Sequence, residues 1–144
     1  MLKAIHPLLG SDLLWILSSL GHGDEIAVVD ANFPATRLAT RLVSMPGVDT
    51  AALLAAILTV LPLDDSMARP VSMMRAAAGT DVATTASGSI RVALEAAAGA
   101  NIGIAELDRL AFYERAANAF AIVSTGERRP YGNVLLTTGT VPGS

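Results

Sequence analysis

Short apolar runs, each bounded by glycine, proline or polar residues, dominate the hydrophobic pattern of the chain. Four of these runs predict strands, at residues 26–29, 71–75, 119–125 and 133–137. The first reads Ile-Ala-Val-Val, which is too short for a helix and is typical of a buried strand.

Longer stretches with start and stop signals predict helices between these strands. Ser11 is a predicted N-cap for a helix through about Leu20 that stops at Gly21, and Asp49 or Thr50 can cap a helix over 51–61 that Pro62 ends. Two more helices are predicted at 90–98, closed by Gly99, and at 110–118. Residues 80–89 are small and polar and predict a mobile loop, and residues 126–130 predict a charged turn.

Alternating strands and helices predict a single α/β domain over residues 1–144. No internal repeat or linker interrupts the pattern, and 144 residues are enough to bury a sizeable core. The longest apolar stretch, 51–63, contains Thr59 and Pro62 and is shorter than the about 20 residues that cross a bilayer. We therefore expect neither a membrane span nor a signal peptide.

Composition narrows the classes of function. Hydrophobic residues make up 52% of the chain and charged residues 16%, which favours an oligomer that covers part of this apolar surface. The net charge is −3 and no basic block is present, which argues against nucleic acid as a partner. The chain has no cysteine, which excludes thiol catalysis and cysteine-ligated zinc and fits a reducing cytoplasm.

The first candidate for chemistry is His22, which stands between Gly21 and Gly23 just before the strand at 26–29. Asp30 follows that strand directly, at the carboxyl end where α/β proteins bind ligands. An imidazole and an acid delivered to one site suggest proton chemistry on a small polar substrate. From the pattern alone, a single His between glycines is more often a loop residue or helix cap than a catalyst, and Asp30 could cap the next element.

A second polar set lies in the C-terminal third of the chain, at Arg109, Tyr113, Tyr131 and Asn133. A guanidinium, two phenols and an amide offer the donors and acceptors that sugar hydroxyls need. Tyr113 could also fill the core, since its spacing from Leu110 and Ala116 is helical.

The order and spacing of these motifs resemble the D-ribose pyranase/L-fucose mutarotase family over nearly the whole chain. The matching segments are Gly-His-Gly-Asp-Glu-Ile at 21–26, Asp30 with Asn-Phe-Pro-Ala at 32–35, Leu-Pro-Leu-Asp at 61–64, Phe-Tyr-Glu-Arg-Ala at 112–116, Ala-Phe-Ala at 119–121, Thr-Gly-Glu at 125–127, and Tyr-Gly-Asn at 131–133 followed by Leu135 and Gly139. Arg109 and the Phe-Tyr-Glu-Arg context favour the fucose branch over the ribose branch.

The resemblance implies an isomerase that interconverts the α and β anomers of L-fucose and needs no metal or cofactor. It also implies a compact subunit of the same fold as the family, with a central sheet flanked by helices, assembled into a ring, commonly a decamer, with the sugar site near a subunit interface. The family's proton donor falls on His22, and its sugar contacts fall on Asp30, Arg109, Tyr131 and Asn133, with Asp64 and Tyr113 added in some relatives.

One segment departs from the family pattern. Relatives often carry an aromatic residue shortly after the acid at position 64, where this chain reads Asp65-Ser66-Met67. This departure keeps a second sugar, such as D-ribose, open as the substrate. A non-catalytic sugar-binding ring protein linked to transport is the alternative from another class.

Overall fold

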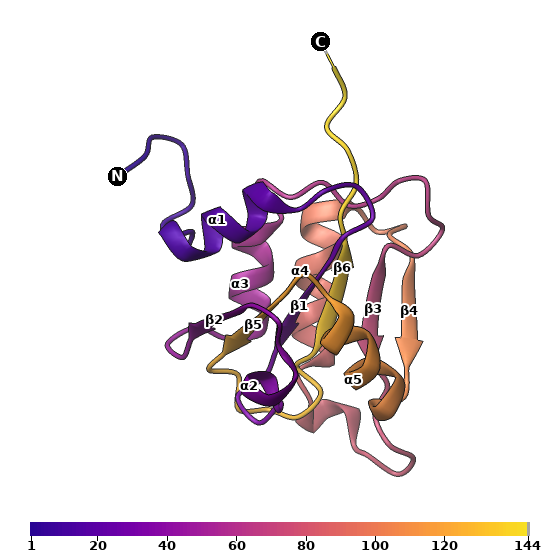
Figure 1. Cartoon of the computed structure of the whole chain (residues 1–144). Coiled ribbons are helices and arrows are strands. Elements are labelled where there is room, and N and C mark those ends of the chain that lie inside the picture. Colours follow the sequence, from indigo (N-terminus) through magenta and orange to yellow (C-terminus); the bar gives the residue numbers. More distant parts are fainter. Residues whose placement is uncertain (144) are drawn as a thin grey trace.

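The computed structural model describes residues 1–143 and contains six strands and five α-helices among them. The strands are β1 (Glu25–Val29), β2 (Leu42–Met45), β3 (Val71–Met74), β4 (Ile104–Leu107), β5 (Ala121–Thr125) and β6 (Val134–Thr137). The helices are α1 (Ser11–Ser19), α2 (Ala35–Leu38), α3 (Thr50–Ile57), α4 (Ser87–Ala98) and α5 (Arg109–Asn118), with a 3₁₀ turn at Val82–Thr84. Strands and helices alternate along much of the chain, so the predicted α/β class is confirmed (Figure 1).

All six strands form one sheet in the order β2-β5-β1-β6-β3-β4. β6 pairs antiparallel with both β1 and β3, whereas the other neighbours pair parallel. Five strands therefore end together, at the place where β6 begins. We call this the carboxyl end of the sheet, and we call the opposite end, where β6 stops, the amino end.

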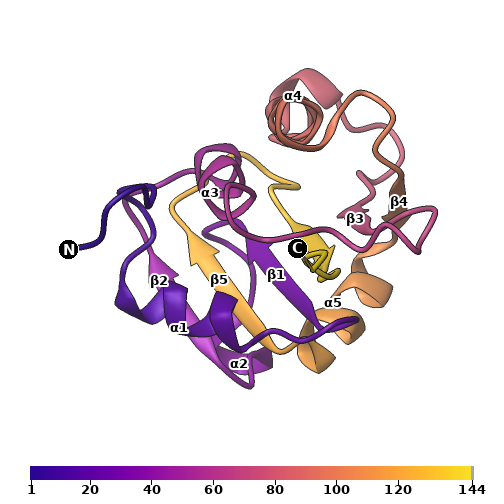
Figure 2. The ribbon, with the colours of Figure 1, turned by 90° about the horizontal axis from the view of Figure 1, so that it is seen from above.

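Two apolar clusters lie on the two faces of the sheet. Ile26 and Val28 of β1 pack with residues of α1, α3 and α4, and Ala27 and Val29 pack with residues of α2 and α5. This alternation follows from the period of two along a strand. Seen from above, α3 and α4 lie on one side of the sheet, and α2 and α5 lie on the other (Figure 2). The central sheet flanked by helices, expected from the resemblance, is confirmed.

The predicted strands and the main helices are present, but several boundaries were wrong. Gly10, not Ser11, occupies the N-cap of α1 and makes no side-chain cap, because Ser11 is already helical. α3 ends at Ile57 and tapers into a turn, before Pro62 is reached. α4 begins at Ser87, inside the stretch predicted as a mobile loop, whereas Asp49 caps α3 and Gly99 closes α4 as expected.

Four short elements were not predicted, namely α2, β2, β4 and the 3₁₀ turn at Val82–Thr84. α2 has four residues, and β2 and β4 are four-residue strands on the two edges of the sheet. No helix within residues 1–143 combines the length and apolar character that a bilayer crossing requires.

An ion pair fastens α5 to the amino end of the sheet. Nη2 of Arg115 donates to Oε2 of Glu25, the first residue of β1, and Nη1 donates to Ser72 Oγ of β3 at 3.2 Å. Thr137 Oγ1 of β6 donates to the same Glu25 carboxylate at 3.4 Å. The Arg115 and Glu25 side chains are only 36% and 23% exposed, so water screens this pair less than a surface pair.

We expect Arg115→Met to lower the free energy of unfolding by roughly 1.5–3 kcal/mol, the size of a hydrogen bond to a charged group, because Glu25 loses its charged partner. Denaturant unfolding monitored by circular dichroism measures this change. Arg128→Met removes an exposed guanidinium and serves as the matched control, with an expected change within about 0.5 kcal/mol. Equal effects of the two substitutions would contradict a fastening role for Arg115.

Candidate active site

The sheet divides the expected site residues between its two ends. Asp30, Arg109, Tyr131 and Asn133 lie at the carboxyl end, because each directly follows a parallel strand or precedes β6. His22 precedes β1 and Asp64 precedes β3, so both lie at the amino end. β1 has five residues, and at about 3.3 Å per residue it places roughly 16 Å between the two ends. Within one chain, His22 and Asp30 therefore lie at opposite ends of β1.

Asp30 and Asn133 hold each other at the carboxyl end. The backbone N–H of Asp30 donates to Asn133 Oδ1 at 2.9 Å. The Asp30 carboxylate accepts from the backbone N–H of Asn32 at 3.1 Å and of Gly132 at 3.2 Å. Burial raises the pKa of Asp30, and these hydrogen bonds oppose that rise. The carboxylate is thereby fixed in place by two segments that are distant in sequence.

Tyr131 and Gly132 take conformations that this close approach requires. Tyr131 has a φ of 59°, in the left-handed region that side chains other than glycine rarely occupy. A Cβ on Gly132 would lie 2.7 Å from Glu127 Cγ and 3.1 Å from Asp30 Cβ, so a side chain there would displace the buried acids. The Tyr131 hydroxyl accepts from the backbone N–H of Ala77 at 3.1 Å. Backbone strain of this kind often accompanies a functional site.

Arg109 and Tyr131 line one open cavity of about 460 Å³, together with Asp108 and the segment 75–78 that follows β3. Arg109 lies in the first turn of α5, where the Asp108 side chain accepts from Ala111 N and caps the helix. The Arg109 guanidinium carbon is 5.9 Å from the centre of the Tyr113 ring. The cavity thus brings together two of the predicted sugar contacts.

Tyr113 neighbours Arg109 but is not among the residues that line this cavity. Its ring meets Phe33 edge-on, with 5.1 Å between the ring centres, and belongs to the apolar cluster beneath α5. Tyr113 is therefore placed to support Arg109 and the β1–α2 loop. This position agrees with the core-filling interpretation of Tyr113 as well as with a nearby role in the site.

At the amino end, His22 pairs with Asp64. Nε2 of His22 lies 3.3 Å from Asp64 Oδ2, and the imidazole is 54% exposed while Asp64 is buried. The backbone N–H and the hydroxyl of Ser66 donate to Asp64 Oδ1 at 3.0 and 2.6 Å. The Ser66 hydroxyl is the main reason that the pKa of Asp64 is lowered, with His22 adding to the effect. Ser66, at the segment that departs from the family pattern, thus stabilises the ionised partner of His22.

The end of β6 holds the His22 turn and the Asp64 loop together. Gly23 N donates to Thr138 O, and Thr138 N donates to Asp24 O, both at 2.8 Å. On the other side Asp64 N donates to Thr137 O at 3.0 Å. A Cβ on Gly139 would overlap the backbone of Leu63 and Asp64, so only glycine allows this approach. Sequence analysis did not assign a role to these β6 residues, although Gly139 was among the matching motifs.

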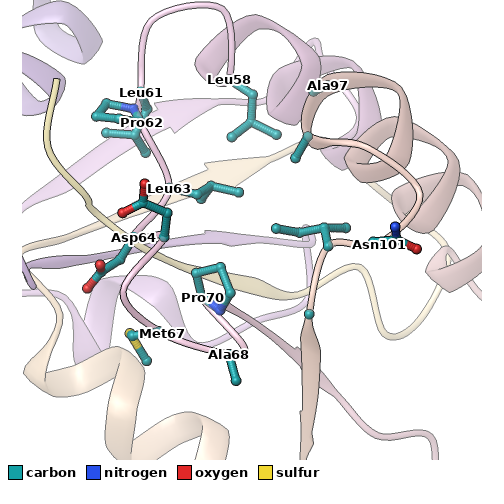
Figure 3. Close-up of a pocket in the computed structure, with 14 residues that line it drawn as sticks. Leu58, Leu61, Pro62, Leu63, Asp64, Met67, Ala68, Pro70, Ala97 and Asn101 are labelled. Carbon is teal, nitrogen blue, oxygen red and sulfur yellow. The ribbon is translucent and has the colours of Figure 1, made fainter. Parts of the chain in front are cut away.

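A further cavity of about 500 Å³ opens beside Asp64 at the amino end. Figure 3 shows that its walls are mostly apolar side chains, including Leu58, Leu63, Pro70 and Ala97, with Asp64 on one side and Asn101 on another. It contains none of the carboxyl-end residues. Within residues 1–143, no three His, Cys, Asp or Glu side chains gather in a way that could hold a metal ion.

Comparison with known proteins places this chain among sugar-related proteins. The profile of the RbsD / FucU transport protein family matches residues 3–141. The L-fucose mutarotase of Histophilus somni (strain 2336) is 39% identical over 142 residues, which cover 99% of each chain.

Solved structures agree with the sequence comparison. The fucose mutarotase of Streptococcus pneumoniae, solved in complex with L-fucose, has a TM-score of 0.91 and 38% identity, covering 98% of this chain and 100% of that one. RbsD of Bacillus subtilis, complexed with D-ribose, has a lower TM-score of 0.73 and 26% identity, covering 99% and 100%. The chain is thus more similar to the fucose protein than to the ribose protein.

The two acids are expected to titrate on opposite sides of the ordinary aspartate pKa of 3.8, with Asp30 above it and Asp64 below it. The ionised Asp64 therefore stabilises the fold at pH values above 3.8, and this stability is lost as the pH falls through the folded-state pKa of Asp64. For Asp30 the direction is reversed, because its ionisation costs stability as the pH rises from 3.8 through its folded-state pKa. Carboxyl ¹³C NMR measures both, with Asp30→Asn and Asp64→Asn for assignment. An Asp30 midpoint below 3.8 would contradict its burial.

Proposed function

The chain belongs to the RbsD / FucU family, and we propose that it is an L-fucose mutarotase, an isomerase that interconverts the α and β anomers of L-fucose. The observation that carries this proposal is full-length similarity to proteins named for this activity, including one solved with L-fucose. The lower similarity to RbsD makes D-ribose the second candidate. The cysteine-free composition supports a cytoplasmic location.

Mutarotation requires two proton movements and no redox change. A proton reaches the ring oxygen, another leaves the anomeric hydroxyl, and the bond between C1 and the ring oxygen breaks to give the open aldehyde. Rotation about the bond between C1 and C2 and reclosure then give the other anomer. General acid–base catalysis supplies typically ~10²–10⁴-fold, which suffices because the reaction in water is already fairly fast.

His22 is proposed as the proton donor. Its imidazole is exposed, and Asp64 engages Nε2, which leaves Nδ1 free to face a sugar oxygen. An ionised Asp64 also stabilises the protonated imidazole at the moment it gives up or receives a proton. This assigns Asp64 to the orientation of His22 rather than to direct contact with the sugar.

The carboxyl end is proposed to bind the pyranose. Arg109 and the Tyr131 hydroxyl line the cavity and can donate to sugar oxygens, and Asp30 can accept from a hydroxyl. Among residues 1–143 the acceptor for Nδ2 of Asn133 is a sulfur, Met74 Sδ at 3.7 Å, so this nitrogen retains donor capacity for a sugar hydroxyl. Tyr113 supports Arg109 from behind.

We propose that two copies of the chain complete each site. The proton donor and the sugar-binding residues lie at opposite ends of β1, so a sugar can meet both only where the amino end of one copy contacts the carboxyl end of the next. Such head-to-tail contacts use two different surfaces and close into rings. Exposed apolar side chains, such as Trp15 and Leu110, are available to such contacts. This supports a homo-oligomeric ring, for which the family suggests a decamer.

Saturation-transfer NMR on the anomeric protons tests the activity. Exchange between the α and β signals of L-fucose is expected to accelerate with the protein, and exchange of D-ribose and D-glucose much less so. His22→Ala is expected to reduce the catalysed rate by about 10²-fold or more while L-fucose still binds. Accelerated exchange of D-ribose alone would show that the protein is a D-ribose pyranase. Binding of a sugar without accelerated exchange of any sugar would show that the protein binds sugars but does not catalyse mutarotation.

Mixing two inactive variants tests the shared site. Homo-oligomers of His22→Ala lack the donor, and homo-oligomers of Asp30→Ala lack the sugar contact, so each is expected to be nearly inactive. After dissociation and random reassembly, about one site in four combines an intact donor with an intact sugar contact, and activity returns to that fraction. If the mixture stayed as inactive as its parents while forming mixed rings, each site would belong to a single copy.

A further inference from the structure

A second cavity adjoins the proposed sugar cavity at Tyr131. It has a volume of about 300 Å³, and its lining includes Arg75, Arg91, Glu106 and Tyr131. Arg75, Ala76 and Tyr131 line both cavities, so the two form neighbouring parts of one cleft at the carboxyl end. A ligand held against Tyr131 can therefore reach both.

The side chains that line this second cavity carry more positive than negative charge. Arg75 follows β3 and Arg91 lies on α4, and both face the single carboxylate of Glu106, with Nε of Arg75 at 3.5 Å from Oε2 and Nη2 of Arg91 at 3.0 Å from Oε1. Two guanidinium groups thus share one negative charge. This local positive excess occurs in a chain whose net charge is −3.

The two arginines keep unused donors. Arg75 also donates from Nη2 to the backbone carbonyl of Glu106 at 3.4 Å. The other guanidinium nitrogens, Nη1 of Arg75 and Nε and Nη1 of Arg91, have no acceptor among residues 1–143. The three side chains are 58%, 42% and 47% exposed for Arg75, Arg91 and Glu106, and pairs this exposed contribute little to stability. The contribution of these ion pairs to folding stability is therefore too small to explain why the three charged side chains lie together.

Free guanidinium donors in a cavity suit an anionic oxygen group, which they bind through paired hydrogen bonds. The N-terminal turn of α4 adds to this field, because Ser87 lines the same cavity. We propose that Arg75 and Arg91 form an anion subsite beside the sugar site, which admits pyranoses with a carboxylate or phosphate at C6. This inference rests on the proposed mutarotase function and extends its substrate class.

A matched series of sugars tests the subsite, because L-fucose, L-galactose, L-galacturonate and L-galactose 6-phosphate differ only at C6. Saturation transfer gives the KM of each for anomer exchange. We expect the carboxylate or the phosphate sugar to have a KM at least about tenfold below that of L-galactose. The two anionic sugars show separately whether the subsite prefers a carboxylate or a phosphate. Equal KM values for L-galactose and both anionic sugars would overturn the proposal.

Single substitutions test whether Arg75 and Arg91 cause the lower KM of the anionic sugars. Arg75→Ala and Arg91→Ala are each expected to abolish the advantage of the anionic sugar. Arg91→Ala, at a residue that lines only the second cavity, is also expected to leave exchange of L-fucose unchanged, and Arg128→Ala, which lines neither cavity, is expected to change neither property. Glu106→Gln removes the competing carboxylate and is expected to lower the KM of the anionic sugar further. An unaltered preference in the two arginine variants would refute the assignment.

Two controls distinguish anion binding by the arginines from a role in assembly and from an effect on catalysis. Size-exclusion chromatography of Arg75→Ala and Arg91→Ala shows whether the arginines instead hold neighbouring copies together, and dissociation of the assembly would overturn the proposal. Calorimetric titration with inorganic phosphate measures the subsite without catalysis. If L-fucose exchange is absent but phosphate binds in an Arg75-dependent way, the mutarotase function fails and the anion subsite stands.

Discussion

The position of β6 is the constraint on which both halves of the site depend. This strand runs antiparallel between β1 and β3, which are parallel to each other, and bonds to both. Its beginning places Tyr131 and Asn133 beside Asp30, and its end binds the His22 turn and the Asp64 loop. The residues proposed to contact the sugar and the proposed proton donor are thus attached to opposite ends of one four-residue strand.

The two buried aspartates of the candidate site differ in pKa because their surroundings differ. Asp30 lies deep beneath the carboxyl end, where burial raises its pKa despite several backbone donors. Asp64 receives the Ser66 hydroxyl and faces a basic imidazole, so its pKa is lowered. Asp64 is therefore the acid that stays ionised to lower pH and pairs with His22, whereas Asp30 is a buried acceptor of backbone N–H groups at the carboxyl end.

Sequence patterns predicted the central strands well, because β1, β5 and the start of β6 are continuous apolar runs. They missed β2 and β4, since edge strands of four residues bury less and carry a weaker pattern. The residues themselves pointed to most of the candidate site, whereas Asp64 was added only by the resemblance, which covers nearly the whole chain. The pairing of His22 with Asp64 could not be predicted, because it depends on how β6 inserts between distant strands. The separation of His22 from Asp30 could have been predicted, because the two residues precede and follow the predicted strand at 26–29.

The two edges of the sheet have a consequence for how copies of the chain associate. β2 and β4 are short, and Glu106 of β4 carries two arginines on its exposed side, whereas Arg41 flanks β2 and reaches across to Phe120. Short, charged edges are poor templates for another strand, so side-by-side growth into larger sheets is discouraged. Helical faces and the ends of the strands are therefore better suited than the sheet edges to contacts between copies of the chain.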